Sequence, residues 1–208
     1  MSNTVTDAYG EEINPETGLS NKKLLMWVFL GSDVMFFGAF IATYLVYRNQ
    51  NLVGPYPSEI LNIPITSAST FVLLMSSVAM VLAVYYLKGN MLGRAKFWLL
   101  SVVLLGTAFL GFQVYEFAEF VDHGLTPSTN LFGTTFFILT GLHGTHVGIG
   151  VLWLLGMLVA EYKGKLRKDN SSNLEIAGLY WHFVDIVWIV IFTVIYLISF
   201  DDGPPGAL

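Results

Sequence analysis

The sequence predicts an all-α, polytopic membrane protein, a bundle of five transmembrane helices. Hydrophobic residues make up 54% of the 208 positions and charged residues only 12%, whereas a soluble domain has about 45–50% apolar and about 25% charged residues. Mean hydropathy is +0.63. Five runs are apolar on all sides for about 20 residues or more, enough helix to cross a hydrocarbon core about 30 Å thick. The alternating pattern of membrane β-strands is absent from these runs.

The five spans follow one another along the chain, with short polar breaks between them. We expect them at residues 24–47, 66–87, 97–116, 131–160 and 178–200. The breaks carry residues that favour turns, for example Gly54-Pro55 and Gly124-Leu125-Thr126-Pro127. A polar tail, 1–23, precedes the membrane domain, 24–200, and a short tail, 201–208, follows it. The first run is longer than the apolar core of a signal peptide, about 7–15 residues, so we interpret it as a retained span.

Basic residues predict the orientation of the bundle. Lys and Arg near span ends are retained on the cytoplasmic side of a membrane. All ten basic residues except Arg48 fall at span ends on the side of the N-terminus; they are Lys22, Lys23, Lys88, Arg94, Lys96, Lys163, Lys165, Arg167 and Lys168. We therefore expect a cytoplasmic N-terminus and, because the number of spans is odd, a periplasmic C-terminus.

Composition excludes several classes of function. A net charge of −5 with few basic residues excludes a nucleic-acid-binding surface. The chain has no Cys, which excludes thiolate nucleophiles, iron–sulfur clusters and thiolate metal sites within it. Carboxylates and the four His are then the strong metal ligands that remain.

Two carboxylates and three imidazoles lie well inside the predicted spans: Asp33, Asp185, His143, His146 and His182. A charge at the centre of a membrane helix costs about 2.5–3.5 kcal/mol on insertion scales, so each carboxylate needs a partner or a proton. At about 1.5 Å of rise per residue, Asp33, His146 and Asp185 all fall in the cytoplasmic half of the bilayer. We therefore predict one polar cluster in which Asp33, His146, His182 and Asp185 satisfy one another.

Two interpretations of this cluster remain open. It handles protons or lipid headgroups, or it is a polar clamp that fixes the register of the helices, which is a common use of such contacts in membranes. Haem or metal ligation is a weaker interpretation, because bis-His haem needs ligands that face each other across a shared space. His143 and His146 are instead three positions apart on one helix.

Small and polar residues elsewhere predict helix packing. Gly144 and Gly148, with Gly141 nearby, form a small-xxx-small face on which another helix can approach closely. Gln113 and Glu116, three positions apart near the outer end of the third span, are interpreted as a hydrogen-bonding pair. A solvated helix end is the alternative for that pair.

Four motifs resemble subunit III of the haem-copper terminal oxidases, in the five-helix bacterial form. They are residues 32–37 (SDVMFF), 113–116 (QVYE), 136–147 (FFILTGLHGTHV) and 180–188 (YWHFVDIVW). The resemblance covers the chain from the first span to the last. The first-helix carboxylate of this family is usually Glu, where this chain has Asp33, and longer members carry two further N-terminal helices.

The resemblance implies a subunit with no catalytic centre of its own, in an oxidase that reduces oxygen to water and pumps protons during aerobic respiration. Haems and copper would be held by partner subunits and bound phospholipids by this chain. Its main partner would be subunit I, with subunit II, a small subunit IV and a larger respiratory supercomplex as further partners. The location implied is the bacterial cytoplasmic (inner) membrane.

Other functions remain open on the sequence alone. Subunit III of a quinol oxidase and an accessory subunit of a nitric oxide reductase share the same motifs. A different class is an independent small transporter or channel that uses Asp33 and the His residues as a proton relay. The interrupted half-helices typical of many transporters are absent from the sequence pattern.

Overall fold

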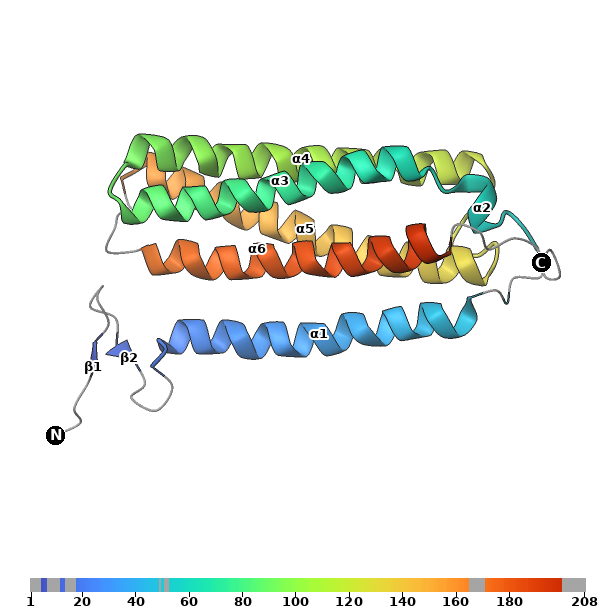
Figure 1. Ribbon diagram of the computed structural model, residues 1–208, viewed down its shortest axis with the longest axis horizontal. Helices are drawn as coiled ribbons and strands as arrows, with labels where there is room; N and C mark the ends of the chain where they lie inside the picture. The colour runs from blue at the N-terminus through green and yellow to red at the C-terminus, as the bar shows by residue number, and fades with distance from the viewer. Residues whose placement is uncertain are drawn as a thin grey trace.

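The computed structural model describes residues 5–6, 12–13, 18–48, 50, 53–164 and 171–199. Five long helices run side by side (Figure 1), and each is long and apolar enough to cross a membrane. They are α1 (Asn21–Tyr47), α3 (Ile63–Lys88), α4 (Leu92–Asp122), α5 (Leu131–Tyr162) and α6 (Ser171–Phe192), which continues as the π-helical segment η2 (Thr193–Ile198). The predicted five-helix membrane fold is confirmed.

Short elements complete the described chain. A single turn, α2 (Pro57–Ile60), precedes α3. Two-residue strands, β1 (Val5–Thr6) and β2 (Glu12–Ile13), pair antiparallel ahead of α1. Helix α1 begins at Asn21, inside the predicted polar tail 1–23, and the tail 201–208 lies outside the described residues.

The helices extend past the apolar runs that predicted them. The third span was expected at 97–116, but α4 covers Leu92–Asp122, and α6 begins at Ser171 where the fifth span was expected from 178. A helix satisfies its own backbone hydrogen bonds, so it continues into the headgroup region where polar side chains are solvated. Hydropathy marks only the part of each helix inside hydrocarbon.

Local chemistry sets several of the helix ends. Asn62 accepts a hydrogen bond from the backbone N–H of Ile65 at 3.4 Å and caps α3. Asn130 caps α5 in the same way, accepting from the N–H of Gly133 at 2.7 Å. After α4 the chain turns at Gly124, whose φ of +84° is unfavourable for residues with a Cβ. The two fully described breaks, 89–91 and 123–130, are therefore short connections between consecutive long helices.

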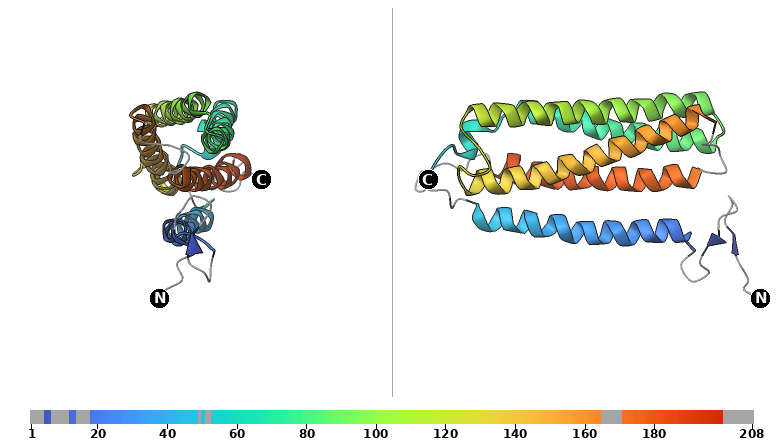
Figure 2. Two further views of the ribbon diagram at one scale, coloured as in Figure 1. Left: turned by 90° about the vertical axis from the view of Figure 1, so that its left-hand side faces the viewer. Right: turned by 180° about the vertical axis from the view of Figure 1, so that it is seen from behind.

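Four of the helices form a closed ring, and the fifth lies outside it. Helices α3, α4, α5 and α6 contact one another in that cyclic order, while the main contacts of α1 are with α5 and α6 (Figure 2). In α1, 17% of the most apolar stretch is buried, compared with 50% in the span formed by α6 and η2. Helix α1 is therefore the peripheral element of the fold.

Two tryptophans of α6 fill the middle of the ring. The indole N–H of Trp181 donates to Ser76 Oγ at 3.0 Å, and that of Trp188 donates to Thr70 Oγ1 at 2.9 Å, so both bind α3. Space for Trp181 comes from two glycines: a Cβ on Gly106 would lie 2.6 Å from its ring and one on Gly150 would lie 2.9 Å from it. The Trp181 indole can pack this closely because α4 and α5 have no side chain at Gly106 and Gly150.

Candidate functional site

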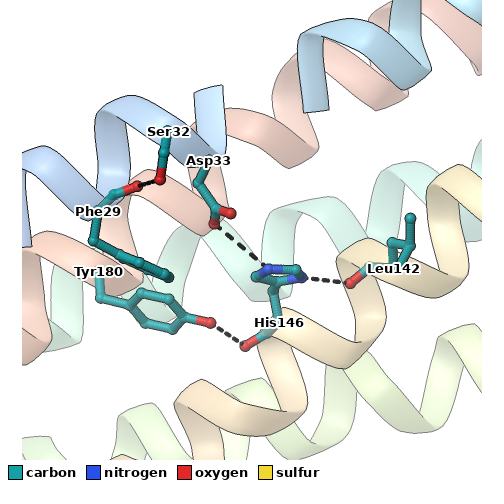
Figure 3. A network of polar contacts seen from close by, with 6 residues as sticks. All are labelled: Phe29, Ser32, Asp33, Leu142, His146 and Tyr180. Atoms are coloured by element: carbon teal, nitrogen blue, oxygen red, sulfur yellow. Dashed lines mark hydrogen bonds and ion pairs between the residues drawn. The ribbon is translucent and has the colours of Figure 1, made fainter. Parts of the chain in front are cut away.

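The peripheral helix is joined to the ring by a carboxylate–imidazole pair. Asp33 Oδ2 of α1 lies 3.5 Å from His146 Nε2 of α5 (Figure 3). Nδ1 of the same imidazole lies 2.7 Å from the carbonyl oxygen of Leu142. A carbonyl can only accept, so Nδ1 carries a proton and Nε2 is the nitrogen available to the carboxylate. The separation suits an ion pair and exceeds the length of a charge-assisted hydrogen bond, about 2.7–2.9 Å.

Aromatic side chains enclose this pair. Phe37 packs edge-on against the His146 ring with the ring centroids 5.0 Å apart. The Tyr180 hydroxyl of α6 donates to the backbone carbonyl of His146 at 2.9 Å (Figure 3). The side chains of Asp33 and His146 are 11% and 17% exposed. Three helices, α1, α5 and α6, therefore meet at one largely buried polar point.

His182 and Asp185 do not join that pair. Nδ1 of His182 lies 2.6 Å from Ser77 Oγ, which belongs to α3. Asp185 is 3% exposed, and its carboxyl group lies near the same Ser77 rather than near Asp33 or His146. The predicted single cluster is thus corrected: the structure pairs Asp33 with His146 only. A shared depth in the membrane places these residues at similar positions along their helices. It does not fix the direction in which each side chain points, so it does not bring all four together.

His143 occupies an aromatic site of its own. Its ring stacks on Trp188 at 4.9 Å between centroids and meets Phe109 edge-on at 5.9 Å. The residue is fully buried, and neither ring nitrogen has a hydrogen-bond partner among the described residues. Among those residues, no group of three or more His, Asp or Glu converges in a way that could hold a metal ion. His143 packs as a flat ring in the core.

Gln113 and Glu116 are both buried, but they bind different helices. Gln113 Nε2 donates to the carbonyl oxygen of Thr140 in α5 at 2.7 Å. A carboxylate oxygen of Glu116 accepts from Thr66 Oγ1 in α3 at 2.6 Å. The predicted pair is therefore two separate links, through which α4 holds its two neighbours in the ring. The solvated alternative is wrong, since both side chains are 7% exposed.

The predicted glycine face is only partly a packing surface. A Cβ on Gly144 would lie 2.5 Å from Gln113 Oε1, so this glycine makes room for the amide that binds Thr140. A Cβ on Gly141 or Gly148 would meet no described atom within 4 Å. Among the described residues, neither glycine therefore provides a close approach for a neighbouring helix. The role predicted for Gly141 and Gly148 is corrected accordingly, because residues of one helix stripe can pass beyond the edge of the neighbour they were expected to meet.

A shared carboxylate at the end where α1 begins was missed by the sequence analysis. Glu175 of α6 accepts from Lys23 of α1 at 2.6 Å and lies 2.7 Å from Nζ of Lys88 at the end of α3. Hydropathy placed Glu175 in a loop, since the apolar run starts three residues later. One sequence feature could have indicated this contact: Glu175 is an acidic residue at the end of the bundle where Lys23 and Lys88 were predicted.

An apolar cleft of about 950 Å³ opens at the same end of the molecule. Phe29 of α1 and Trp153 of α5 line it, and both contact the ring of Tyr180, with centroids 6.4 and 5.9 Å away. Lys22 and Asn173 are its polar lining residues. The cleft therefore lies between the peripheral helix and the ring, with Tyr180 linking its lining to the Asp33–His146 pair.

Comparison with known proteins places the chain in a family. The profile of the family "Cytochrome c oxidase subunit III" matches residues 15–200. The chain is 39% identical over 179 residues to cytochrome c oxidase subunit 3 of Bacillus sp. (strain PS3), covering 86% of each chain. It is 39% identical over 188 residues to quinol oxidase subunit 3 of Bacillus subtilis (strain 168), covering 90% of this chain and 92% of the relative. The chain belongs to the cytochrome c oxidase subunit III family of the haem-copper oxidases.

Proposed function

We propose that this chain is the non-catalytic third subunit of a bacterial aerobic oxidase, and that it holds phospholipid beside the subunits that carry the haems and copper. Subunit I would be its main partner, with subunit II and a small subunit IV in the same complex. The reaction of the whole complex would be reduction of oxygen to water coupled to proton pumping. Membership of the family supports the assembly, and the cleft beside α1 supports the lipid.

The observation that carries the lipid role is the cleft between α1 and the ring. Its volume, about 950 Å³, is in the range of small-molecule sites, which are mostly apolar with a few polar groups. Apolar side chains line most of it, while Lys22 supplies a positive group for a phosphate. An acyl chain fits the apolar lining, and the Asp33–His146 pair keeps α1 in place beside it.

Charge placement supports the proposed orientation. Lys22, Lys23 and Lys88 lie at the end where α1 begins, together with Arg94, Lys96 and Lys163. Arg48 lies at the opposite end, where its guanidinium donates to the carbonyl oxygen of Ile198 at 2.8 Å. Lys165, Arg167 and Lys168 fall outside the described residues. By the positive-inside rule, the N-terminus would face the cytoplasm of the bacterial inner membrane.

Purification of the tagged chain from detergent-solubilised membranes tests this proposal. We expect subunits I and II and phospholipid to co-purify with it, and the isolated complex to consume oxygen. Recovery of the chain alone, or transport activity by the chain alone in liposomes, would contradict the proposal and favour an independent transporter. Accessory chains of a nitric oxide reductase in the same preparation would also contradict it.

A quinol oxidase is the second candidate, because the relatives carry both names at the same identity. The quinol oxidase subunit 3 of Bacillus subtilis and the cytochrome c oxidase subunit 3 of Bacillus sp. (strain PS3) are each 39% identical to this chain. Oxygen uptake by the purified complex with reduced cytochrome c, compared with uptake with a quinol, separates the two candidates.

A further inference from the structure

The outer face formed by α3 and α6 carries a polar group at the depth where a membrane is most apolar. His182 is the twelfth residue of a span that runs from Ser171 to Ile198, so it lies roughly 16 Å from the start of that helix. Its hydrogen-bond partner, Ser77, is similarly central in α3. Both side chains are partly exposed on the surface of the chain. Helices α3 and α6 are the two front helices of the ring in Figure 1.

The hydrogen bonding of His182 is incomplete within this chain. Nδ1 lies 2.6 Å from Ser77 Oγ, whereas Nε2 makes no hydrogen bond to the residues that the structure describes. In a neutral imidazole one ring nitrogen donates and the other accepts. Whichever role Nδ1 takes toward Ser77, Nε2 is therefore left with an unfilled donor or acceptor. Leaving such a group in hydrocarbon is costly, because nothing there replaces the hydrogen bond to water.

Polar side chains on the outer face of α4 do not leave a hydrogen-bonding group unpaired. On α4, Ser101 Oγ donates to the carbonyl oxygen of Phe97 at 2.9 Å, and Thr107 Oγ1 donates to that of Val103 at 2.7 Å. These hydroxyls are satisfied by their own helix, so acyl chains can cover that face without leaving a polar group unpaired. The α3–α6 face differs from the α4 face in this respect.

Apolar side chains surround His182 and would pack against whatever covers it. Within two helical turns of His182 or Ser77 they include Leu74 (37% exposed), Val81 (55%), Ile186 (60%) and Ile189 (42%). A lipid chain would satisfy these residues but not Nε2, because it has no hydrogen-bonding group. A second transmembrane helix satisfies both, since it brings apolar side chains and can bring one polar side chain at the same depth.

We propose that, in the assembled oxidase, a transmembrane helix of another subunit covers the α3–α6 face and places a hydrogen-bonding side chain against Nε2 of His182. This proposal rests on the proposed function, since it needs the partner subunits. The side chain opposite would be one that can donate or accept, such as Ser, Thr, Asn, Gln or Tyr.

Photocrosslinking in the intact complex tests the proposal. A photoreactive benzophenone side chain replaces Ile186, one helical turn from His182, and separately Leu104 on α4, which is equally exposed at 61% and also central in its helix. We expect irradiation to join position 186 to another oxidase subunit and position 104 to lipid. If the bulky group at 186 releases the chain from the complex while that at 104 does not, this also supports the proposal.

Two results would overturn it. Crosslinking of position 186 to lipid alone in an intact complex would show that acyl chains cover this face, and crosslinking to a second copy of the chain would show a different partner. If the unmodified chain does not co-purify with oxidase subunits, the proposed function itself fails; a normal complex without a protein crosslink at 186 contradicts only the present inference.

A pair of substitutions supplies an independent readout. His182→Leu removes the hydrogen bonds of both ring nitrogens, whereas Ser77→Ala removes only the internal one. We expect His182→Leu to lower retention of the chain in the complex about threefold or more, as for loss of an average interhelical hydrogen bond, and Ser77→Ala to lower it less. Equal retention of the two variants would contradict a contact at Nε2.

Discussion

The carboxylate of Asp33 and the imidazole of His146 are far enough apart that a side chain one methylene longer at position 33 would bring them closer. Their closest atoms are 3.5 Å apart, and the other His146 nitrogen is committed to Leu142. We expect Asp33→Asn to destabilise the attachment of α1 by about 0.6–1.7 kcal/mol, the range measured for interhelical polar contacts in membranes. Asp33→Glu should keep or strengthen it, because the longer side chain reaches Nε2. Thermal unfolding of the purified complex measures both, and an Asn variant as stable as the Glu variant would contradict the pair.

Gly144 and Gly148 belong to one small-residue pattern, but only Gly144 is closely packed within this chain. A side chain at 144 meets Gln113 Oε1 and displaces the amide that binds Thr140, whereas a side chain at 148 meets open space. We expect Gly144→Leu to cost about 1–3 kcal/mol through overpacking, and Gly148→Leu to leave the fold of this chain intact. Detergent stability of the two variants measures this. A destabilised Gly148→Leu chain outside the complex would contradict the packing described.

The sequence predicts which residues carry chemistry better than it predicts their contacts. Asp33 and His146 could be identified as partners because both lie in spans at one depth. The aromatic surroundings of His143 could not be predicted: residues three apart on a helix differ by about 60° in direction, and that angle places His143 in the core and His146 toward α1. The rotation of each helix about its axis is set by packing against its neighbours. The residue pattern of a single helix does not contain that information.

At the scale of the elements, α1 is the helix that depends most on discrete polar contacts. Its main contacts are with α5 and α6, and little of its apolar stretch is buried. Near the N-terminal end, Lys23 reaches Glu175 of α6; farther along, Asp33 faces His146 of α5. The ring helices instead share a core with Trp181 and Trp188. We infer that α1 can loosen while the ring remains folded.

Glu175→Gln tests that inference at the end where α1 begins. The substitution removes the charge shared by Lys23 and Lys88 and leaves two positive groups close together. We expect a loss of about 1 kcal/mol, as for a good partly exposed ion pair, and faster proteolysis near the start of α1. Asp122→Asn, an exposed carboxylate at the opposite end of the bundle, is the matched control. Equal proteolysis of the two variants would show that the shared carboxylate does not hold α1.

Spans were predictable at this scale because hydrocarbon thickness fixes the length of an apolar run. The helix ends were not, since capping by Asn62 and Asn130 and the turn at Gly124 are decided by short polar sequences that hydropathy ignores. For the same reason the sequence placed Glu175 in a loop, although it lies in the first turns of α6.

For the whole molecule, the arrangement of a closed ring with one peripheral helix creates the cleft. The ring packs Trp181 closely against the backbone of Gly106 and Gly150, where an added Cβ would lie 2.6 and 2.9 Å from the indole. The apolar cleft lies instead between α1 and α5, with Asn173 and Ile176 of α6 completing its lining. Composition alone predicted the membrane, but it could not predict this space, because a cleft depends on how two helices are angled as well as on which residues line it.

Filling the cleft should therefore displace lipid without unfolding the protein. Gly156 lines the cleft, and a Cβ there would meet no described atom within 4 Å, so Gly156→Trp should be accommodated by the backbone while its indole occupies the volume of an acyl chain. Gly38→Trp on α1 is the control, because Gly38 has the same free space but does not line the cleft. We expect mass spectrometry of the purified complexes to show less bound phospholipid for Gly156→Trp than for the control, with unchanged helix content by circular dichroism. Equal phospholipid in the two complexes would mean that the lipids of the complex bind elsewhere.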